Sequence, residues 1–328
     1  MLHVQYKHIK TPFKHPFRTA HGVKTHQEAL LIRMSVGPYS GMGEAPAIHY
    51  YDVSVEKMIS ELEQKMPILS RYAFTEPERF WHFCHHLFPH NSFLICALDM
   101  AYWNMYAMRQ QKSIRALWNL PDSKGPITDL TIGIDDKEAM CDKISANPWP
   151  VYKIKVASVS DIDTLQALRK VTKSPFRIDA NAAWSVEDAC MILPQLENLG
   201  IEWVEQPLAK DNLEGMLVLK EKTSIPFIAD ESCVGEEDVM KCAPYFDGIN
   251  IKLTKCGGLT PARRMIDEAR SKNLQIMMGC MNETEVGTEA MMHFLPLLDY
   301  ADMDGPLLLD IPVLQRIAYE QAHLIWKV

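Results

Sequence analysis

Several features are absent from this 328-residue sequence, and each absence excludes a class of protein. No run approaches 18 consecutive apolar residues, so we expect no transmembrane helix. The first ten residues, MLHVQYKHIK, are interrupted by charge and histidine and lack the apolar core of a signal peptide. The formal net charge of −8 argues against nonspecific binding to nucleic acid or to an anionic membrane.

The eight cysteines are scattered along the chain and include no CxxC pair. The densest group of coordinating side chains lies around Cys84, and no second Cys/His pair follows it at the spacing of a zinc site. In a chain without an export signal, this scatter is typical of buried thiols in a reducing cytosol. We therefore expect a cytoplasmic protein.

What the sequence does contain is enough apolar residues for a large core, at 47% hydrophobic and 23% charged. Its character changes near residue 115. Before this point, Glu28–Val36 and Gly41–Ala45 have the pattern of strands. Three helical patterns follow, at residues 54–65, Pro77–His86 and Ser92–Arg109. Strands followed by helices predict an α+β module.

From about residue 128, short β-rich runs alternate with helical ones at intervals of roughly 20–27 residues, the spacing of a (β/α) barrel. An open, doubly wound sheet has a similar rhythm, so periodicity alone leaves both folds open. The expected strands are Thr128–Ile134, Val151–Val156, Phe176–Asn181, Ile201–Glu205, Pro226–Asp230, Gly248–Leu253, Gln275–Gly279 and one near Tyr300.

Ionisable residues fall at the ends of five successive expected strands. They are Lys155, Asp179, Glu205, Asp230 and Lys252, at intervals of 24, 26, 25 and 22 residues. Each interval matches one strand–helix unit. Because the ends of parallel barrel strands meet at one mouth, we expect these five side chains to face a shared space.

Three carboxylates on adjacent strands would repel one another, and a divalent cation removes that difficulty. All-oxygen ligands from Asp179, Glu205 and Asp230 favour Mg²⁺ over Mn²⁺ or Zn²⁺. The alternative is that each acid separately caps the helix after it. Three acids in phase, between two lysines also in phase, favour the metal site.

Lys153 and Lys155 are two residues apart and share a strand face. Like charge at this range, with a metal nearby, lowers the pKa of an amine, so one of these lysines could act as a general base. The alternative is an edge strand, on which both lysines would be solvated. Lys252 is expected to point at the barrel mouth from the side opposite Lys155. Lys255 and the Gly257-Gly258 pair are expected to form a turn, and no GxxxxGK[ST] phosphate loop is present.

Two opposed lysines around Mg²⁺ predict a particular reaction class. The metal would bind a substrate carboxylate and stabilise the enediolate that forms when the α-proton leaves. One lysine would remove that proton and the other would return one to the opposite face, which inverts the centre. Lys155 and Lys252 are the catalytic candidates, and Lys153 is an auxiliary one.

These residues lie in motifs that resemble those of the enolase superfamily, muconate-lactonising subgroup. The motifs are Lys153-Ile154-Lys155, Asp179–Trp184, Glu205-Gln206-Pro207, Ala229–Ser232 and Asn250–Leu253. Gly41–Pro46 and Ala97–Trp103 resemble the family's capping domain. The resemblance implies a modified (β/α)7β barrel over residues 116–315, a capping domain over residues 1–115 with a mobile loop, and a C-terminal segment, 316–328, that returns to the cap.

Asp302-Met303-Asp304 resembles the Asp-x-Asp motif of the dipeptide epimerases. Two carboxylates two residues apart in an extended segment share a face and could hold an α-ammonium group, although Asp-Gly is also a turn sequence. The resemblance implies a dipeptide with its C-terminal carboxylate on Mg²⁺ and its ammonium on these acids. Further candidates for substrate binding are Thr131 and Met281, and the supporting candidates are Asn181, Glu231 and Glu283.

Relatives that act on Ala-Glu often place an arginine in the capping loop, where this sequence has His21 and, three residues on, Lys24. Either could be cationic beside a carboxylate. The expected substrate is therefore L-Ala-D/L-Glu or another L-Ala-Xaa dipeptide, and the first option fits murein peptide metabolism. The alternatives are an o-succinylbenzoate synthase, an N-succinylamino acid racemase or a muconate cycloisomerase, and a noncatalytic barrel. A homo-oligomer is one assembly that the sequence permits.

Overall fold

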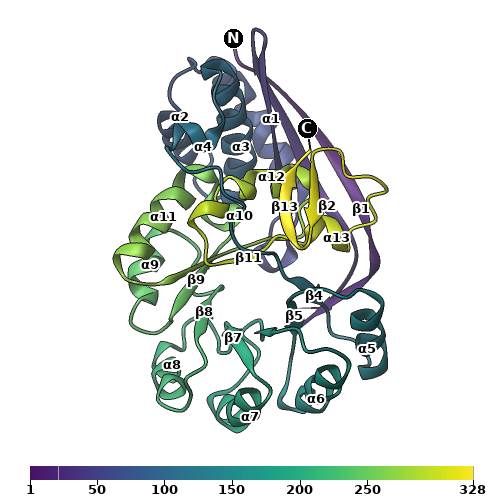
Figure 1. The fold of residues 1–328 in the computed structure, drawn as a ribbon. Coiled ribbons are helices and arrows are strands. Elements are labelled where there is room, and N and C mark those ends of the chain that lie inside the picture. The colour runs from purple at the N-terminus through teal and green to yellow at the C-terminus, as the bar shows by residue number, and fades with distance from the viewer. Residues whose placement is uncertain (21, 328) are drawn as a thin grey trace.

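The computed structural model describes residues 1–20 and 22–327, which form a sheet-and-helix cap set on a barrel (Figure 1). The cap sheet consists of β1 (His3–Thr19), β2 (Gly22–Val36) and β3 (Tyr39–Pro46), all antiparallel. The pairing of β1 with β2 is irregular between Pro12 and Phe17. The far end of β1 reaches the barrel, where the carbonyl of Arg18 accepts from the amide of Ile134 at 3.0 Å.

The cap helices are α1 (Val55–Leu69), α2 (Pro77–Leu87), α3 (Ser92–Gln110) and α4 (Ile114–Leu117), with a 3₁₀ turn at His49–Tyr51. Side-chain caps begin α1 and α3: Ser54 accepts from the amide of Lys57, and Asn91 accepts from that of Leu94. β3 packs against α3 through Gly41, where a Cβ would collide with the carbonyl oxygen of Ala101. Glycine is required there by the close approach of the helix backbone.

The cap differs from the prediction in two places. The first helix does not stop before Pro67 but continues to Leu69, because burial of Leu62 and Leu69 in the cap core outweighs the hydrogen bond that the proline removes. Strand β1 was not predicted, because its mostly exposed residues break the apolar alternation that marks a half-buried strand.

The barrel strands within the described residues lie side by side in chain order and are all parallel. They are β4 (Leu130–Ile132), β5 (Tyr152–Lys155), β6 (Phe176–Asp179), β7 (Ile201–Glu205), β8 (Phe227–Ala229), β9 (Gly248–Ile251), β10 (Gln275–Gly279) and β11 (Tyr300–Asp302). The amide of Asp129 donates to the carbonyl of Ala301 at 3.2 Å, which joins the last strand to the first. The sheet is therefore closed, and the open doubly wound alternative is excluded.

Between successive strands the chain forms α5 (Lys137–Ala146), α6 (Ile162–Val171), α7 (Val186–Asn198), α8 (Leu213–Lys220), α9 (Glu236–Cys242), α11 (Leu259–Ser271) and α12 (Glu285–Met292). Short α10 (Leu253–Cys256) precedes α11, short α13 (Gly305–Leu308) follows β11, and 3₁₀ turns lie at Val159–Asp161 and Leu295–Leu297. Eight strands and seven intervening helices among the described residues confirm the (β/α)7β prediction.

The C-terminal segment is a hairpin of β12 (Ile317–Glu320) and β13 (His323–Trp326). Ile317 and Leu324 are buried in the larger of the two main cores, which is the core of the barrel. The hydroxyl of Tyr319 donates to the carbonyl of Met303 at 2.8 Å. These contacts tie the hairpin to the barrel, while the domain bounds near residues 115 and 315 remain a prediction.

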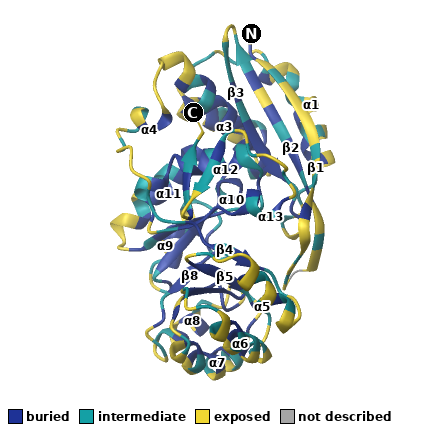
Figure 2. Cartoon of the chain, turned by 45° about the vertical axis from the view of Figure 1, so that its right-hand side comes forward, coloured by how far each residue is buried: buried dark blue, intermediate teal, exposed yellow. Residues whose placement is uncertain are grey.

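Helix α3 joins the cap to the barrel. It is buried nearly all round (Figure 2), with Leu98 in the cap core and Met100 in the barrel core. Asp99 accepts from the amide (2.9 Å) and hydroxyl (2.8 Å) of Thr260 at the start of α11. None of the helices in the described part of the chain is long and apolar enough to cross a membrane.

Candidate active site

Strand register brings the predicted residues to one end of the barrel. Lys155 on β5 is paired with Asp179 on β6, and Asp179 is paired with Glu205 on β7. Asp230 and Lys252 come directly after the last residues of β8 and β9. Side chains that are one strand–helix unit apart in the sequence therefore lie next to one another around the barrel mouth.

The order of strands fixes where each group stands on this ring. With β4 as the first strand and β11 as the eighth, Asp179, Glu205 and Asp230 follow strands three to five. Lys155 and Lys252 follow strands two and six, four strands apart and therefore on opposite sides. Asp302, at the end of the eighth strand, faces Glu205 across the ring.

A cavity of about 470 Å³ lies over this ring, between the barrel and the cap. Its wall includes both lysines and nearly all the predicted substrate-binding residues. From the barrel come Thr131, Lys155, Asn181, Asp230, Glu231, Lys252, Cys280, Met281, Asn282, Asp302 and Asp304, and from the cap Phe17, Thr19, Gly22, Val23, Lys24, Ile48, His49, Tyr50 and Tyr51. His21 lies outside the described residues, so its predicted role stays a prediction.

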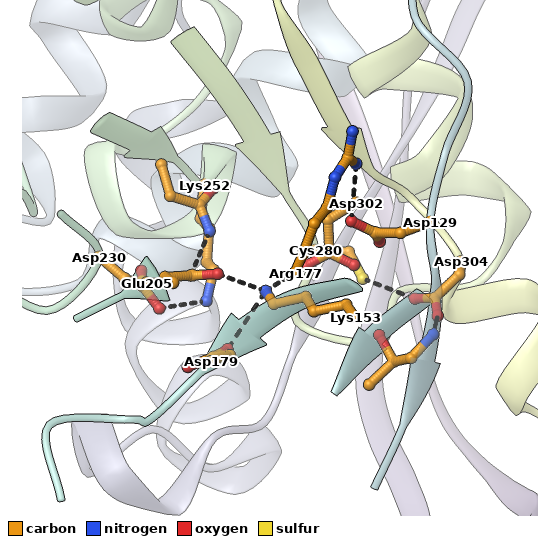
Figure 3. A network of polar contacts seen from close by, with 12 residues as sticks. Asp129, Lys153, Arg177, Asp179, Glu205, Asp230, Lys252, Cys280, Asp302 and Asp304 are labelled. Atoms are coloured by element: carbon orange, nitrogen blue, oxygen red, sulfur yellow. Dashed lines mark hydrogen bonds and ion pairs between the residues drawn. The ribbon is translucent and has the colours of Figure 1, made fainter. Parts of the chain in front are cut away.

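The three carboxylates are almost completely buried and engage the lysines (Figure 3). Asp179 pairs with Lys155, and its second oxygen accepts from the amide of Asn181 at 2.9 Å. Glu205 Oε2 lies 2.6 Å from Lys153 Nζ, and Asp230 Oδ2 lies 2.7 Å from Lys252 Nζ. Each acid of the trio thus has a cationic neighbour.

Burial and neighbouring charge act differently on the three acids. Burial raises the pKa of Asp179, but Lys155 and Lys153 outweigh it and lower that pKa to about 2. The pKa of Asp230 is likewise lowered, because Lys252 and Lys255 outweigh burial. Burial and Asp179 raise the pKa of Glu205 to about 7, against the opposing charge of Lys153. Glu205 is the acid whose charge is least compensated.

These donors fit a hard divalent cation. The trio offers carboxylate oxygens from three adjacent strands, as Mg²⁺ requires, with no sulfur or imidazole among them. Glu205 Oε2 is buried and, despite its ion pair, accepts no hydrogen bond of ordinary geometry from the described residues. This oxygen has coordination capacity for a cation in addition to its ion pair with Lys153.

Lys153 lies beneath the cavity floor at 1% exposure, surrounded by Asp302 (2.7 Å), Glu205 (2.6 Å) and Asp179 (3.2 Å). Burial lowers its pKa, but these acids outweigh burial and hold that pKa well above its usual range. The prediction that its lysine neighbour would lower the amine pKa is therefore wrong for Lys153. The pKa of Lys252 is also raised, since Asp230 and Glu205 outweigh burial.

The second acidic group is formed by Asp302 and Asp304, which lie beside Cys280. Asp302 Oδ2 pairs with Lys153, whereas its Oδ1 is buried without a hydrogen-bond partner among the described residues. Asp304 Oδ2 accepts from the amide of Thr131 at 2.6 Å. Asp304 starts helix α13 instead of extending the strand, so the expected shared strand face was wrong, yet both side chains still line the cavity.

The supporting candidates fall into two kinds. Asn181 and Glu231 line the cavity next to the trio. Glu283 is buried, accepts from the amide of Met281 at 2.6 Å, and has its pKa raised to about 7 by burial and by Glu44. Glu44 itself, in the cap, accepts from the amide of Thr284, so this part of the barrel mouth is tied to the cap.

Sequence reasoning missed several buried polar residues. Lys255, expected in a turn, is buried, with its ammonium 2.6 Å from Asp230 Oδ1. Asn250 donates to Glu205 at 2.7 Å, and Arg177 pairs with Asp129 at 2.9 Å below the mouth. The signal for Lys255 was its spacing of three residues from Lys252, which places two residues on one side of a helical turn.

Several known proteins are similar to this chain in sequence or fold. The L-Ala-D/L-amino acid epimerase of Flavobacterium johnsoniae is 43% identical over 296 residues, covering 90% of this chain and 88% of the relative. A substrate-liganded L-Ala-D/L-Glu epimerase from Bacillus subtilis superposes with a TM-score of 0.91 at 27% identity, over 99% of this chain and 96% of that one.

A third similar protein is a dipeptide epimerase from Enterococcus faecalis in complex with Mg and L-Leu-L-Tyr. Its TM-score is 0.89 at 26% identity, and the match covers 98% of this chain and 96% of that chain. The family model described as enolase C-terminal domain-like matches residues 137–309, which is more than half of the sequence. The chain belongs to the enolase C-terminal domain-like family.

Proposed function

We propose that this protein is a Mg²⁺-dependent dipeptide epimerase that inverts the α-carbon of the C-terminal residue. One observation carries the proposal: Lys155 and Lys252 line the same cavity from strands four apart. A base and an acid on opposite faces of one carbon are what inversion by proton transfer requires. Mere cation binding would have no use for them.

The two acidic groups orient the substrate between these lysines. The trio around Glu205 would hold the cation on the side of the C-terminal carboxylate, and Asp302 and Asp304 would hold the α-ammonium group on the other side of the ring. Adjacent α-carbons of a dipeptide are about 3.8 Å apart, so a dipeptide held at both ends has its C-terminal α-carbon near the middle of the mouth. That position lies between the two ammonium groups.

Asp179, Glu205 and Asp230 would hold Mg²⁺, which supplies Lewis-acid stabilisation of the charge that develops on the substrate carboxylate. One lysine, in its neutral form, takes the α-proton onto Nζ. The opposite lysine, in its ammonium form, delivers a proton from its Nζ to the other face. The cap contributes the rings of Phe17, Tyr50 and Tyr51 to the cavity wall, which reduces the access of water to these transfers.

The cap also supports a substrate class. Lys24 lines the cavity, and burial together with Lys252 lowers its pKa to about 8, so it remains largely cationic at neutral pH. This positive charge and the name of the Flavobacterium relative support L-alanyl dipeptides as substrates, including those with an acidic C-terminal residue. Substrates without a free ammonium, such as succinylbenzoate precursors, would leave Oδ1 of Asp302 without a partner, although its Oδ2 still pairs with Lys153.

A cytoplasmic location is part of the proposal. None of the eight cysteines is in a disulfide, as expected in a reducing compartment.

Incubation with Mg²⁺ and a library of L,L-dipeptides in D₂O tests the proposal. We expect a mass gain of one deuterium at the C-terminal residue, together with formation of the L,D epimer. The pattern across the library identifies the preferred side chains. No exchange with any dipeptide, alongside turnover of a succinylbenzoate precursor, would contradict the proposal.

A further inference from the structure

Asp230 is contacted by two lysines, and only Lys252 has a place in the proposed chemistry. Lys252 lines the cavity and contacts Oδ2 of Asp230 at 2.7 Å. Lys255 is 3% exposed and contacts Oδ1 at 2.6 Å, and it is not part of the cavity wall that the described residues form. The two oxygens of one carboxylate are thus shared between an accessible and an inaccessible ammonium.

One short helical turn delivers both lysines. Lys252 is the residue before α10 and Lys255 is its third residue, so the two are three apart and lie on one side of the turn. The turn ends at Gly257, whose φ of 94° is a left-handed conformation that favours glycine. The segment from Lys252 to Gly257 therefore places two ammonium groups against the Asp230 carboxylate, one on each oxygen.

The ammonium of Lys255 is fully used. It also donates to the carbonyl oxygens of Asp230 (2.6 Å), Cys233 (2.8 Å) and Asn250 (3.2 Å). An ammonium has three N–H groups, so these acceptors and Asp230 Oδ1 saturate it. Its contacts join the end of β9, the end of β8 and the turn after β8, and these fix where the Asp230 side chain can point.

We propose that Lys255 is a positioning residue that holds Oδ1 of Asp230 away from the cavity and leaves Oδ2 directed at the cation. The inference rests on the proposed function, in which Asp230 is a cation ligand. Lys255 also keeps an ammonium against Asp230 that the cavity does not reach. One lysine is thereby free to react, and the other is fixed.

Titration of the purified full-length protein with Mg²⁺ by calorimetry tests this role without any substrate. In Lys255→Met, loss of a positive charge favours cation binding and loss of orientation opposes it. Changes in groups that orient metal ligands cost roughly 10–100-fold in affinity, so we expect the second effect to dominate. The Mg²⁺ dissociation constant should rise by about 10–100-fold, and Lys255→Gln, which keeps two N–H donors, should fall between Lys255→Met and the wild type.

The matched control is Thr260→Val on α11, which removes a buried hydrogen bond to Asp99 of α3 and touches no residue of the trio. It should lower the melting temperature and leave Mg²⁺ affinity unchanged. Mn²⁺ in place of Mg²⁺ gives a second readout, since its electron paramagnetic resonance spectrum should change in Lys255→Met and not in Thr260→Val.

An unchanged Mg²⁺ dissociation constant in folded Lys255→Met would overturn the inference, as would loss of folding in both Lys255 variants, which would assign the residue to stability alone. Failure of the wild type to epimerise any dipeptide, with the Mg²⁺ results as expected, would overturn the proposed reaction and leave the role of Lys255 standing.

Discussion

The two acidic groups at the barrel mouth contain the same kind of side chain but are balanced differently. Despite burial, lysines lower the pKa values of Asp179 and Asp230 in the trio and of Asp302 in the second group, whereas burial and Asp179 raise the pKa of Glu205 to about 7. Asp304 has a backbone amide and a thiol beside it, and burial together with Asp302 raises its pKa to about 7. The comparison teaches that its neighbours set the charge of a buried carboxylate, and the proposed roles assign a divalent cation to the trio and a single positive charge to Asp302 and Asp304.

The largest effect should come from removing one charge of the trio. Glu205→Gln keeps the shape of the side chain and removes a ligand charge, so Mg²⁺ affinity should fall by more than the roughly 10–100-fold typical of outlying changes. Epimerase activity should be lost with it. Calorimetric titration with Mg²⁺ measures the loss of affinity. If Glu205→Gln bound Mg²⁺ as tightly as the wild type, the assignment of the cation to the trio would be wrong.

In the second acidic group, Asp302 and Asp304, a substitution should weaken binding of the dipeptide and leave Mg²⁺ binding nearly unchanged. Asp302→Asn removes a charge-assisted hydrogen bond, worth about 1.5–3 kcal/mol, so KM for a dipeptide should rise by about 10–150-fold. Mg²⁺ affinity should change by less than about threefold, because the trio stays intact. A KM that is unchanged while Mg²⁺ affinity falls would assign Asp302 to the metal.

Asp304 should contribute less than Asp302. Its Oδ2 already accepts from Thr131, and an amide oxygen could accept the same bond. We expect Asp304→Asn to raise KM by about fivefold, the scale of a neutral hydrogen bond. Steady-state kinetics on both variants measures the difference, and an effect larger than that of Asp302→Asn would reverse the order.

Asp99 is a buried carboxylate outside both groups, and it allows the effect of burial alone to be measured through the pH dependence of stability. Burial raises the pKa of Asp99 to about 7, above its unfolded value, so its contribution to stability is present at low pH and is lost as pH rises toward 7. The slope is at most about 1.4 kcal/mol per pH unit. Thermal unfolding at pH 5 and pH 8 should show a smaller change in Asp99→Asn than in the wild type. Equal changes in both proteins would contradict this assignment.

The barrel could be predicted from the sequence because its period is local and repeated. Each strand ends within a residue or two of its expected place, so Lys155, Asp179 and Glu205 are at the mouth because of their spacing alone. The comparisons confirm the fold class and the resemblance to dipeptide epimerases.

What escaped prediction depends on contacts between distant segments. Lys255 looked like a loop residue, because nothing local shows that Asp230 and two further carbonyls would surround its ammonium. Strand β1 is held mainly by pairing with β2 and not by an apolar face of its own. Asp304 left the strand because Gly305-Pro306 begins a helical turn there.

The most direct test of the account uses Lys155→Ala and Lys252→Ala in D₂O with each epimer of one dipeptide. Each variant should lose inversion by about 10²–10⁴-fold, the usual contribution of a positioned acid or base, while Mg²⁺ still binds. The remaining lysine should still exchange the α-hydrogen of one epimer only, and the two variants should exchange opposite epimers. Exchange of the same epimer by both variants, or wild-type inversion in either, would contradict two lysines on opposite faces of one carbon.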